Sequence, residues 1–223
     1  TAMVVARSFP ARLVERYCGA AGPIKPGSLA TIIFSSGSTG DPKGVQLTHF
    51  NITSNIESFK QGIRIWPNDC MLGVLPFFHS FGYTVSLWGT VSLPFRSVFH
   101  YNPLDIKTIG ELCKRHEVSV IVTTPTFLQQ YMRRLSPDYF GSVNCVITGA
   151  EKLPERLREA FRDRFGVEPL QGYGTTECSP VVSVNVSDHR SNGIYQIGHK
   201  RGSIGHPLPG VTVQVRDIET GEP

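Results

Sequence analysis

The sequence predicts an α/β domain in which a mostly parallel sheet is flanked by helices. Two runs rich in β-branched residues, 118–122 and 143–147, are typical of parallel strands that are buried on both faces. Stretches with a helical pattern of apolar residues accompany these runs, at 104–116 and 154–166. Strands that alternate with helices build a parallel sheet with helices on both faces.

The first hundred residues contribute elements of both kinds. The apolar run 29–34 predicts a short buried strand. Thr48 is a residue type that caps helices, and we expect a helix from there to about Gly62. Residues 71–75 are typical of a strand. A helical segment is expected from Phe81, followed by a strand at 97–99.

Prolines, glycines and apolar stripes set the limits of the later helices. Pro125 suits the first turn of a helix that runs to about Leu135. The last helix follows Pro154 and ends at Gly166, a residue suited to the left-handed conformation after a helix. The apolar stripes of the helices at 104–116 and 154–166 consist of Ile106, Ile109, Leu112, Cys113, Leu157, Phe161 and Phe165.

Beyond Glu177 the pattern becomes β-rich. Residues 181–186 and 211–215 alternate or run β-branched, and Thr220-Gly221 is a turn signal that suggests the start of a hairpin. We therefore expect an α/β core at 1–180 and the start of a β-rich subdomain at 181–223.

The composition argues against several classes of protein. With 223 residues, 40% of them hydrophobic, the chain can bury a substantial core. A net charge of +4 with dispersed basic residues gives little support to nucleic-acid binding. The five cysteines are odd in number and form no Cys-x-x-Cys pair. Neither a zinc site nor a secreted disulfide framework is expected, and a reducing cytoplasm is the simplest location.

A membrane-spanning segment is not expected either. No signal peptide is recognisable at the start of the chain. The most apolar stretch, 71–95, is interrupted by Pro76, Gly82 and Pro94, so it does not read as one continuous helix. Any attachment to the cytoplasmic face of an inner membrane would come from regions outside this chain.

The most informative stretch is residues 34–44, Phe-Ser-Ser-Gly-Ser-Thr-Gly-Asp-Pro-Lys-Gly. Glycine lets backbone N–H groups approach a ligand closely, and the hydroxyls and the lysine add donors. Together these groups can surround a polyphosphate. The spacing differs from the Walker loop, which has four residues between its first glycine and its Gly-Lys pair.

This loop resembles the phosphate-binding signature of the adenylate-forming superfamily, which includes acyl-CoA synthetases, acyl-carrier-protein synthetases, luciferases and peptide-synthetase adenylation domains. A second signature, Gly-Tyr-Gly-Thr-Thr-Glu at 172–177, follows at the distance expected in that family. Residues 76–82 resemble its acyl-site segment, 149–151 its adenine-facing turn and 202–210 its Gly/Pro segment. The amino-acid sequences of these motifs are most similar to those of acyl-acyl-carrier-protein synthetases, which are often fused to a phospholipid acyltransferase. Long-chain acyl-CoA ligases share much of the pattern.

The resemblance implies a role for each motif. The loop would hold the β and γ phosphates of ATP, with Lys43 as the fixed charge. Thr176 would donate to the α-phosphate, Glu177 would bind Mg²⁺, and Tyr173 would lie against adenine. The residues expected to surround the nucleotide are Ser36, Gly37, Ser38, Thr39, Gly40, Lys43, Gly149, Ala150, Glu151, Tyr173, Gly174, Thr175 and Thr176.

The acyl side of the site would begin at His79, which the resemblance puts beside the carboxylate in an orienting or gating role. The alternative is a satisfied histidine in the core. Phe81, Tyr83, Val85 and Trp88 could line an acyl pocket or only pack in the core. With Lys43, Thr176 and Glu177, His79 completes the expected catalytic set. All these loops would emerge at the carboxyl ends of parallel strands, where such sheets bind ligands.

The expected reaction is ATP-dependent activation of a fatty acid to acyl-AMP, followed by transfer to acyl carrier protein, with coenzyme A as the alternative thiol. An aryl acid is a further alternative substrate. An amino acid is disfavoured because no acidic residue lies between Gly73 and His100. The family's ribose-binding aspartate and lysine-bearing C-terminal domain have no counterpart here. We therefore expect a fragment of the large domain with weak or no turnover alone, and a non-catalytic nucleotide-binding module is a further alternative.

Overall fold

A seven-stranded sheet forms the centre of the chain, of which the computed structural model describes residues 13, 24–36, 41–63 and 65–222. The strands lie in the order β11-β8-β7-β6-β5-β3-β4. Pairing is parallel from β4 to β7 and antiparallel from β7 through β8 to β11. The strands are β3 (Cys70–Gly73), β4 (Arg96–Phe99), β5 (Val120–Thr123), β6 (Cys145–Thr148), β7 (Leu170–Gly174), β8 (Val181–Val184) and β11 (His206–Pro207). The predicted α/β class is confirmed.

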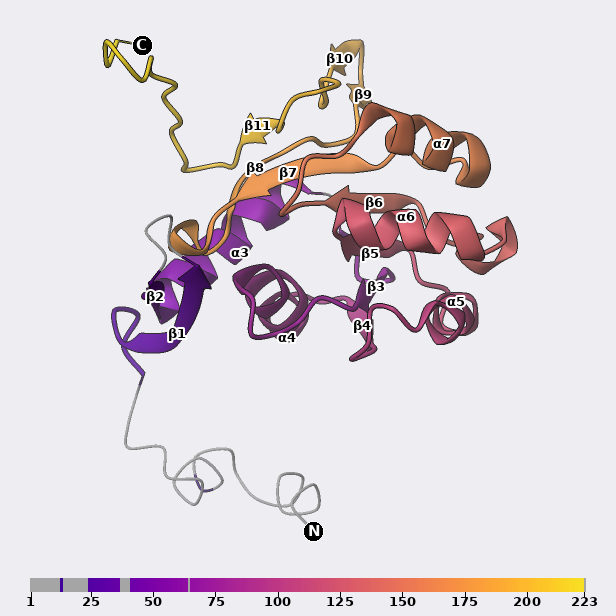
Figure 1. Cartoon of the computed structure of the whole chain (residues 1–223), viewed down its shortest axis with the longest axis horizontal. Coiled ribbons are helices and arrows are strands. Elements are labelled where there is room, and N and C mark those ends of the chain that lie inside the picture. The colour runs from indigo at the N-terminus through magenta and orange to yellow at the C-terminus, as the bar shows by residue number, and fades with distance from the viewer. Residues whose placement is uncertain (1–12, 14–23, 37–40, 64, 223) are drawn as a thin grey trace.

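Helices cover the sheet on both sides, as Figure 1 shows with the sheet seen nearly edge-on. One side carries α5 (Ile106–Arg115), α6 (Pro125–Arg134) and α7 (Glu155–Phe165), and the short 3₁₀ helix η2 (Pro137–Phe140) packs with them. The other side carries α3 (His49–Gly62), the π-helix η1 (Phe81–Trp88) and α4 (Gly89–Ser92). Among the described residues, no helix combines the length and apolar character needed to cross a bilayer.

The parallel strands are buried on both faces because their residues alternate between two hydrophobic cores. In β5, Ile121 packs with the core under α5, α6 and α7, whereas Val120 and Val122 join the core under α3. In β3, Leu72 and Met71 divide in the same way. Full burial of each such side chain contributes about 1.5–3 kcal/mol, which makes the strands the most strongly anchored part of the fold.

Helix limits follow the local signals. Thr124 caps α6 and Pro125 occupies its first turn, while Gly166 ends α7 with a φ of 75°. The helical segment after Phe81 is present, but its first eight residues form a π-helix. Such i→i+5 turns are rare and often accompany functional sites.

The strand expected at 29–34 is present but is not buried as predicted. Strand β1 (Leu29–Ser36) pairs antiparallel with β2 (Pro42–Thr48) in a separate two-stranded sheet. Only one face of this hairpin is covered: Ile33 is buried, whereas Ile32 is 47% and Phe34 72% exposed. An apolar run does not by itself distinguish a central strand from a hairpin strand, and here the tertiary contacts made the difference.

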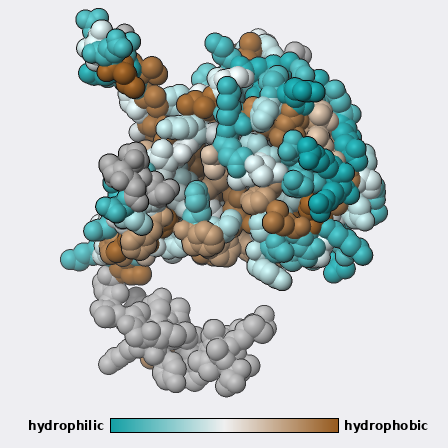
Figure 2. Space-filling model, viewed as in Figure 1, coloured by the Kyte–Doolittle hydropathy of each residue, from teal (hydrophilic) through white to brown (hydrophobic). Residues whose placement is uncertain are grey.

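The region beyond residue 180 begins within the same sheet, since β8 pairs directly with β7. A small hairpin follows, made of β9 (His189–Ser191) and β10 (Ile194–Gln196). The strand expected at 211–215 is not formed. That segment projects from the body of the chain, and its Val213 and Val215 are exposed. Figure 2 shows the projecting arm with both brown and teal surface. The division into two domains stays a prediction.

A capping box starts α3, and its removal should be measurable. The Thr48 hydroxyl accepts a hydrogen bond from the Asn51 N–H (3.1 Å), and Asn51 Oδ1 accepts one from the Thr48 N–H (2.9 Å). We expect Thr48→Ala to lower the free energy of unfolding by about 1 kcal/mol in urea denaturation. Thr53→Ala is the control, because Thr53 lies within the same helix and caps nothing. Equal losses for both variants would contradict the assignment.

Candidate active site

A cavity of about 190 Å³ opens where several strands of the sheet end. Three separate segments supply its polar side: His79 and Ser80 before η1, 148–150 at the end of β6, and 173–176 at the end of β7. Its other side is apolar and includes Phe59 and Val85. The carboxyl edge of a parallel sheet is where α/β proteins bind ligands, so this cavity is the candidate active site.

A hydrogen bond joins two of these segments. Ser80 is 1% exposed, and its Oγ lies 3.2 Å from the Thr176 Oγ1. Thr176 begins η3 (Thr176–Cys178), the 3₁₀ turn that follows β7. The contact holds the two predicted motifs, 76–82 and 172–177, against each other, although 96 residues separate the two side chains in sequence.

Glu177 lies in the same turn with an exposed side chain. No hydrogen bond or ion pair to its carboxylate is found among the described residues. The described part of the chain also contains no group of three His, Cys, Asp or Glu side chains suited to a metal. A lone, unpaired carboxylate fits Mg²⁺, which commonly binds one or two carboxylates together with substrate phosphates rather than a complete protein cage.

The structure places some of the residues expected around adenine at the cavity and one of them outside it. Tyr173, which is 46% exposed, lines the cavity together with Gly149 and Ala150. A Cβ at Gly149 would lie 3.1 Å from the Phe81 ring, so glycine permits close approach of that ring. Glu151 is outside the cavity lining and accepts a 2.6 Å hydrogen bond from the Thr126 hydroxyl.

His79 is not the buried core residue that the alternative interpretation supposed. Its side chain is exposed and lines the cavity, and its Nδ1 accepts a 3.3 Å hydrogen bond from the Phe81 N–H. With Nδ1 acting as an acceptor, the neutral ring carries its proton on Nε2. Of the four candidates for an acyl pocket, Phe81 and Val85 line the cavity. Tyr83 and Trp88 instead pack against each other, with ring centroids 6.4 Å apart.

The expected phosphate loop is described only at its two ends. Gly37, Ser38, Thr39 and Gly40 lie outside the described residues. Ser36 is the last residue of β1, and Lys43, which is exposed, pairs with Ser35 across the hairpin. The loop therefore follows a hairpin strand and not a strand of the large sheet. Because β2 contacts η3, the hairpin still borders the turn that carries Glu177.

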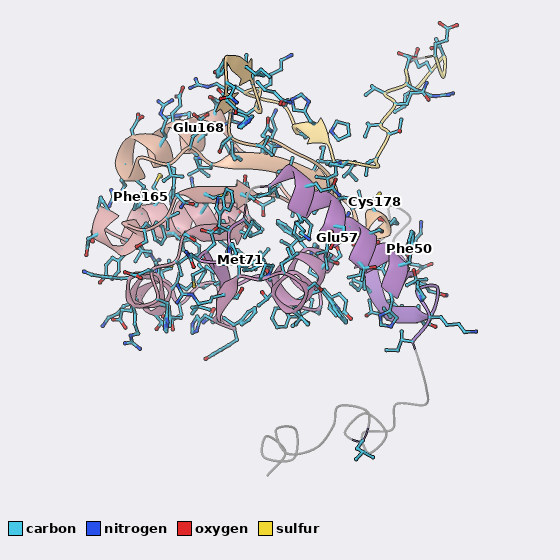
Figure 3. The ribbon with its side chains drawn as sticks, turned by 180° about the vertical axis from the view of Figure 1, so that it is seen from behind. Phe50, Glu57, Met71, Phe165, Glu168 and Cys178 are labelled. Carbon is cyan, nitrogen blue, oxygen red and sulfur yellow. The ribbon has the colours of Figure 1, made fainter. Side chains whose placement is uncertain are left out.

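Asn55 does not line the cavity but supports Val181, which does, and the sequence motifs did not single it out. It is 7% exposed on α3, its Nδ2 donates to the Val181 carbonyl (2.8 Å), and its Oδ1 accepts from the Val181 N–H (3.2 Å). A longer contact of 3.4 Å reaches the Cys178 carbonyl. Figure 3 shows Cys178 beside α3, the helix that also carries the labelled Glu57. A polar residue between buried Ile52 and Ile56 was the available signal, because buried polar groups need partners.

Replacing Asn55 should loosen the turn at η3. We expect Asn55→Ala to lower the free energy of unfolding by about 2 kcal/mol, because the Val181 N–H and carbonyl lose their partners. Asn55→Asp keeps an acceptor for the Val181 N–H but puts a carboxylate oxygen against the Val181 carbonyl, so it should be no more stable than Asn55→Ala. Urea denaturation measures the three proteins. An Asn55→Ala variant as stable as the native protein would show that the amide is not a structural clamp.

Together, the mainly parallel sheet and the cavity at its carboxyl edge define a ligand-binding α/β domain. The model of the family described as AMP-binding enzyme matches residues 9–223. The chain belongs to this AMP-binding enzyme family.

Among curated proteins, the chain is 30% identical over 204 residues to a long-chain-fatty-acid–CoA ligase of Yersinia pestis, covering 87% of this chain and 35% of that protein. It is 33% identical over 199 residues to a probable 4-coumarate–CoA ligase 3 of Dictyostelium discoideum, covering 86% and 34%. The chain thus spans about a third of the length of these relatives.

Solved structures agree on the fold. Apo MatB from Rhodopseudomonas palustris matches with a TM-score of 0.76 at 28% identity, over 89% of this chain and 37% of that one. O-succinylbenzoate coenzyme A synthetase from Bacillus subtilis, in complex with ATP and magnesium ion, matches with a TM-score of 0.65 at 29% identity, over 72% and 33%.

Proposed function

We propose that the full-length protein is an ATP-dependent ligase that activates a fatty acid to acyl-AMP and then transfers the acyl group to a thiol. The observation that carries this proposal is one cavity that joins a polar edge to an apolar interior. Thr176, Tyr173 and His79 lie at the polar edge, and Val85 and Phe59 on the apolar side. A site of this kind suits a substrate with a carboxylate head and a hydrocarbon tail.

The chemistry explains why these residue types are needed. A carboxylate is a poor electrophile because its leaving group would be oxide. Its attack on the α-phosphate of ATP forms acyl-AMP and releases pyrophosphate, and the thiol then displaces AMP to give a thioester. The first step depends on positioning and charge neutralisation more than on covalent help from the protein.

Each of these side chains binds a different part of ATP, its metal ion or the acid. The Thr176 hydroxyl donates to the α-phosphate, where charge builds in the transition state. The Nε2–H of His79 orients the acid carboxylate, Tyr173 packs against the adenine, and Lys43 with the 36–40 loop holds the β and γ phosphates. Glu177 holds Mg²⁺, which neutralises the phosphate charge when bound.

The relatives support the main features. Long-chain-fatty-acid–CoA ligases favour a fatty acid, and the synthetase bound to ATP and magnesium ion favours those two ligands. The 4-coumarate–CoA ligases make an aryl acid the second candidate. The sequences of the motifs favour acyl carrier protein as the thiol, whereas the names of the relatives favour coenzyme A. Thioester formation with each thiol in parallel distinguishes them.

The experiment that tests the reaction is acid-dependent exchange of labelled pyrophosphate into ATP by the full-length protein. Short, medium and long fatty acids, benzoate and amino acids form the panel. Exchange that requires a fatty acid supports the proposal, and exchange that requires only benzoate replaces the substrate class. Binding of Mg·ATP without exchange for any acid would establish the non-catalytic alternative.

A further inference from the structure

Ser80 supplies a buried hydroxyl at the polar edge of the candidate active site. Its side chain is 1% exposed, it lines the cavity, and its Oγ lies 3.2 Å from the Thr176 Oγ1. The roles proposed above for binding ATP and the acid leave this hydroxyl unused. The residue that it contacts, however, is the one proposed to bind the α-phosphate.

The backbone around Ser80 is fixed by close contacts. The His79 N–H donates to the Pro76 carbonyl (3.2 Å), and the Tyr83 N–H donates to the His79 carbonyl (2.9 Å). A Cβ at Gly82 would lie 2.2 Å from the Pro76 carbonyl oxygen, so the absence of a side chain at Gly82 lets the chain turn this tightly. The turn therefore holds the Ser80 side chain in one place.

Ser80 precedes η1 but does not cap it. A serine at this position commonly accepts a hydrogen bond from a backbone N–H in the first helical turn. Here Ser80 has helical dihedral angles, with φ −54° and ψ −35°, and its side chain makes no capping hydrogen bond to a described residue. The hydroxyl is directed to Thr176 instead.

The backbone on the other side of this contact is fixed as well. The Ser179 N–H donates to the Thr176 carbonyl (3.2 Å), and the Cys178 N–H donates to the Thr175 carbonyl (3.0 Å). The Thr175 N–H in turn donates to the Pro180 carbonyl (2.9 Å). The fold itself therefore keeps the two hydroxyls within hydrogen-bond distance of each other.

The direction of this hydrogen bond matters, because a hydroxyl carries one hydrogen and two lone pairs. If Thr176 donated to Ser80, its hydrogen would not be available to a phosphate oxygen. If Ser80 donates, Thr176 keeps its hydrogen for the ligand. A hydroxyl that accepts a hydrogen bond is also polarised into a stronger donor, and such coupling is stronger in a buried site than in water.

We propose that Ser80 is a positioning residue, whose hydroxyl donates to Thr176 and thereby directs and strengthens the hydrogen bond from Thr176 to the α-phosphate. This inference rests on the proposed function, because Thr176 has that role only if the site binds ATP. Ser80 acts through Thr176 and needs no contact with the nucleotide of its own. The benefit is largest in the transition state, where charge builds on the α-phosphate.

The test compares acid-dependent pyrophosphate exchange by the native full-length protein and by Ser80→Ala, with Mg·ATP and the acid that gives the highest native rate. We expect kcat to fall about fivefold, the effect of losing one neutral hydrogen bond. KM for ATP should stay within about twofold of native, because the lost interaction acts mainly in the transition state. Rates are compared at a temperature where urea denaturation shows both proteins to be folded.

Ser86→Ala is the matched control. Ser86 lies on η1 and is fully buried, and its Oγ has no hydrogen-bond partner among the described residues. The change removes the same atom from a nearby buried serine, so kcat should stay native. An equal loss of kcat in both variants would overturn the proposal, because it would reveal a general disturbance of η1.

A double-mutant cycle shows whether Ser80 acts through Thr176. In a Thr176→Val background, Ser80→Ala should lower the residual kcat by less than about twofold, since the hydroxyl that Ser80 orients is gone. In a Thr176→Ser background, which keeps a hydroxyl, the dependence on Ser80 should again be about fivefold. A loss of about fivefold in the Thr176→Val background would show that Ser80 acts independently, and the inference would be wrong.

These measurements separate the inference from the proposed reaction. A native protein that exchanges pyrophosphate with no acid would refute the ligase reaction and the positioning role together. Native exchange with an unchanged kcat in Ser80→Ala would refute the positioning role alone. The same conclusion holds if Ser80→Ala lowers the free energy of unfolding but leaves kcat at the native value in the folded protein.

Discussion

Replacing Glu177 by glutamine is expected to lower the rate of acid-dependent pyrophosphate exchange by roughly 1,000-fold, the upper range for loss of one transition-state stabilising group. Glutamine has the same shape as glutamate and no charge, so the η3 turn should be preserved. The carboxylate is exposed and has no partner among the described residues, so its removal should cost the fold little. Mg²⁺ titration of the residual exchange should show a weakened dependence on the metal.

Glu111→Gln is the matched control for this variant. Glu111 is an exposed carboxylate on α5, and it is not among the residues that line the cavity. We expect it to exchange at the native rate, with an unfolding midpoint equal to that of the Glu177 variant. A Glu177→Gln protein that keeps exchange within a few-fold of native would exclude Glu177 as the metal ligand.

Gly174→Ala is expected to lower both the free energy of unfolding and the rate of pyrophosphate exchange. A Cβ at Gly174 would lie 2.1 Å from the Pro180 carbonyl oxygen, which belongs to the backbone and has no rotamer to escape into. The chain between β7 and β8 must therefore shift. We expect a loss of about 2–3 kcal/mol in the free energy of unfolding, as for other overpacked positions.

The same shift should impair exchange more than stability alone explains. Thr176 and Glu177 lie on the displaced segment, and a misplacement of about 1 Å can cost on the order of 100-fold in rate. Exchange is compared at a temperature where urea curves show the variant to be fully folded.

Gly141→Ala is the control, because a Cβ there has its nearest neighbour at 3.7 Å and the backbone is in the right-handed helical region. It should leave both exchange and stability close to native. A folded Gly174→Ala protein with native exchange would show that the spacing of Gly174 and Pro180 does not position the site.

Much of the fold was accessible from local sequence because the deciding interactions are local. The limits of α6 and α7 follow from Pro125 and Gly166, whose backbone preferences act within a turn of chain. The burial of β5 on both faces follows from an uninterrupted β-branched run. The family could likewise be recognised from motifs in the sequence alone, and the match to the AMP-binding enzyme family confirms it.

The tertiary structure decided what depends on partners distant in sequence. Residues 29–34 would form a strand either in the large sheet or in a hairpin. Their pairing with β2 in a separate hairpin leaves this strand half-exposed. Asn55 gained a role from Val181, which lies 126 residues away. The cavity of the candidate active site exists only because Ser80, Gly149 and Thr176 meet from three separate segments. Periodicity specifies which face a residue occupies, but the neighbour across that face is set by how the whole chain packs.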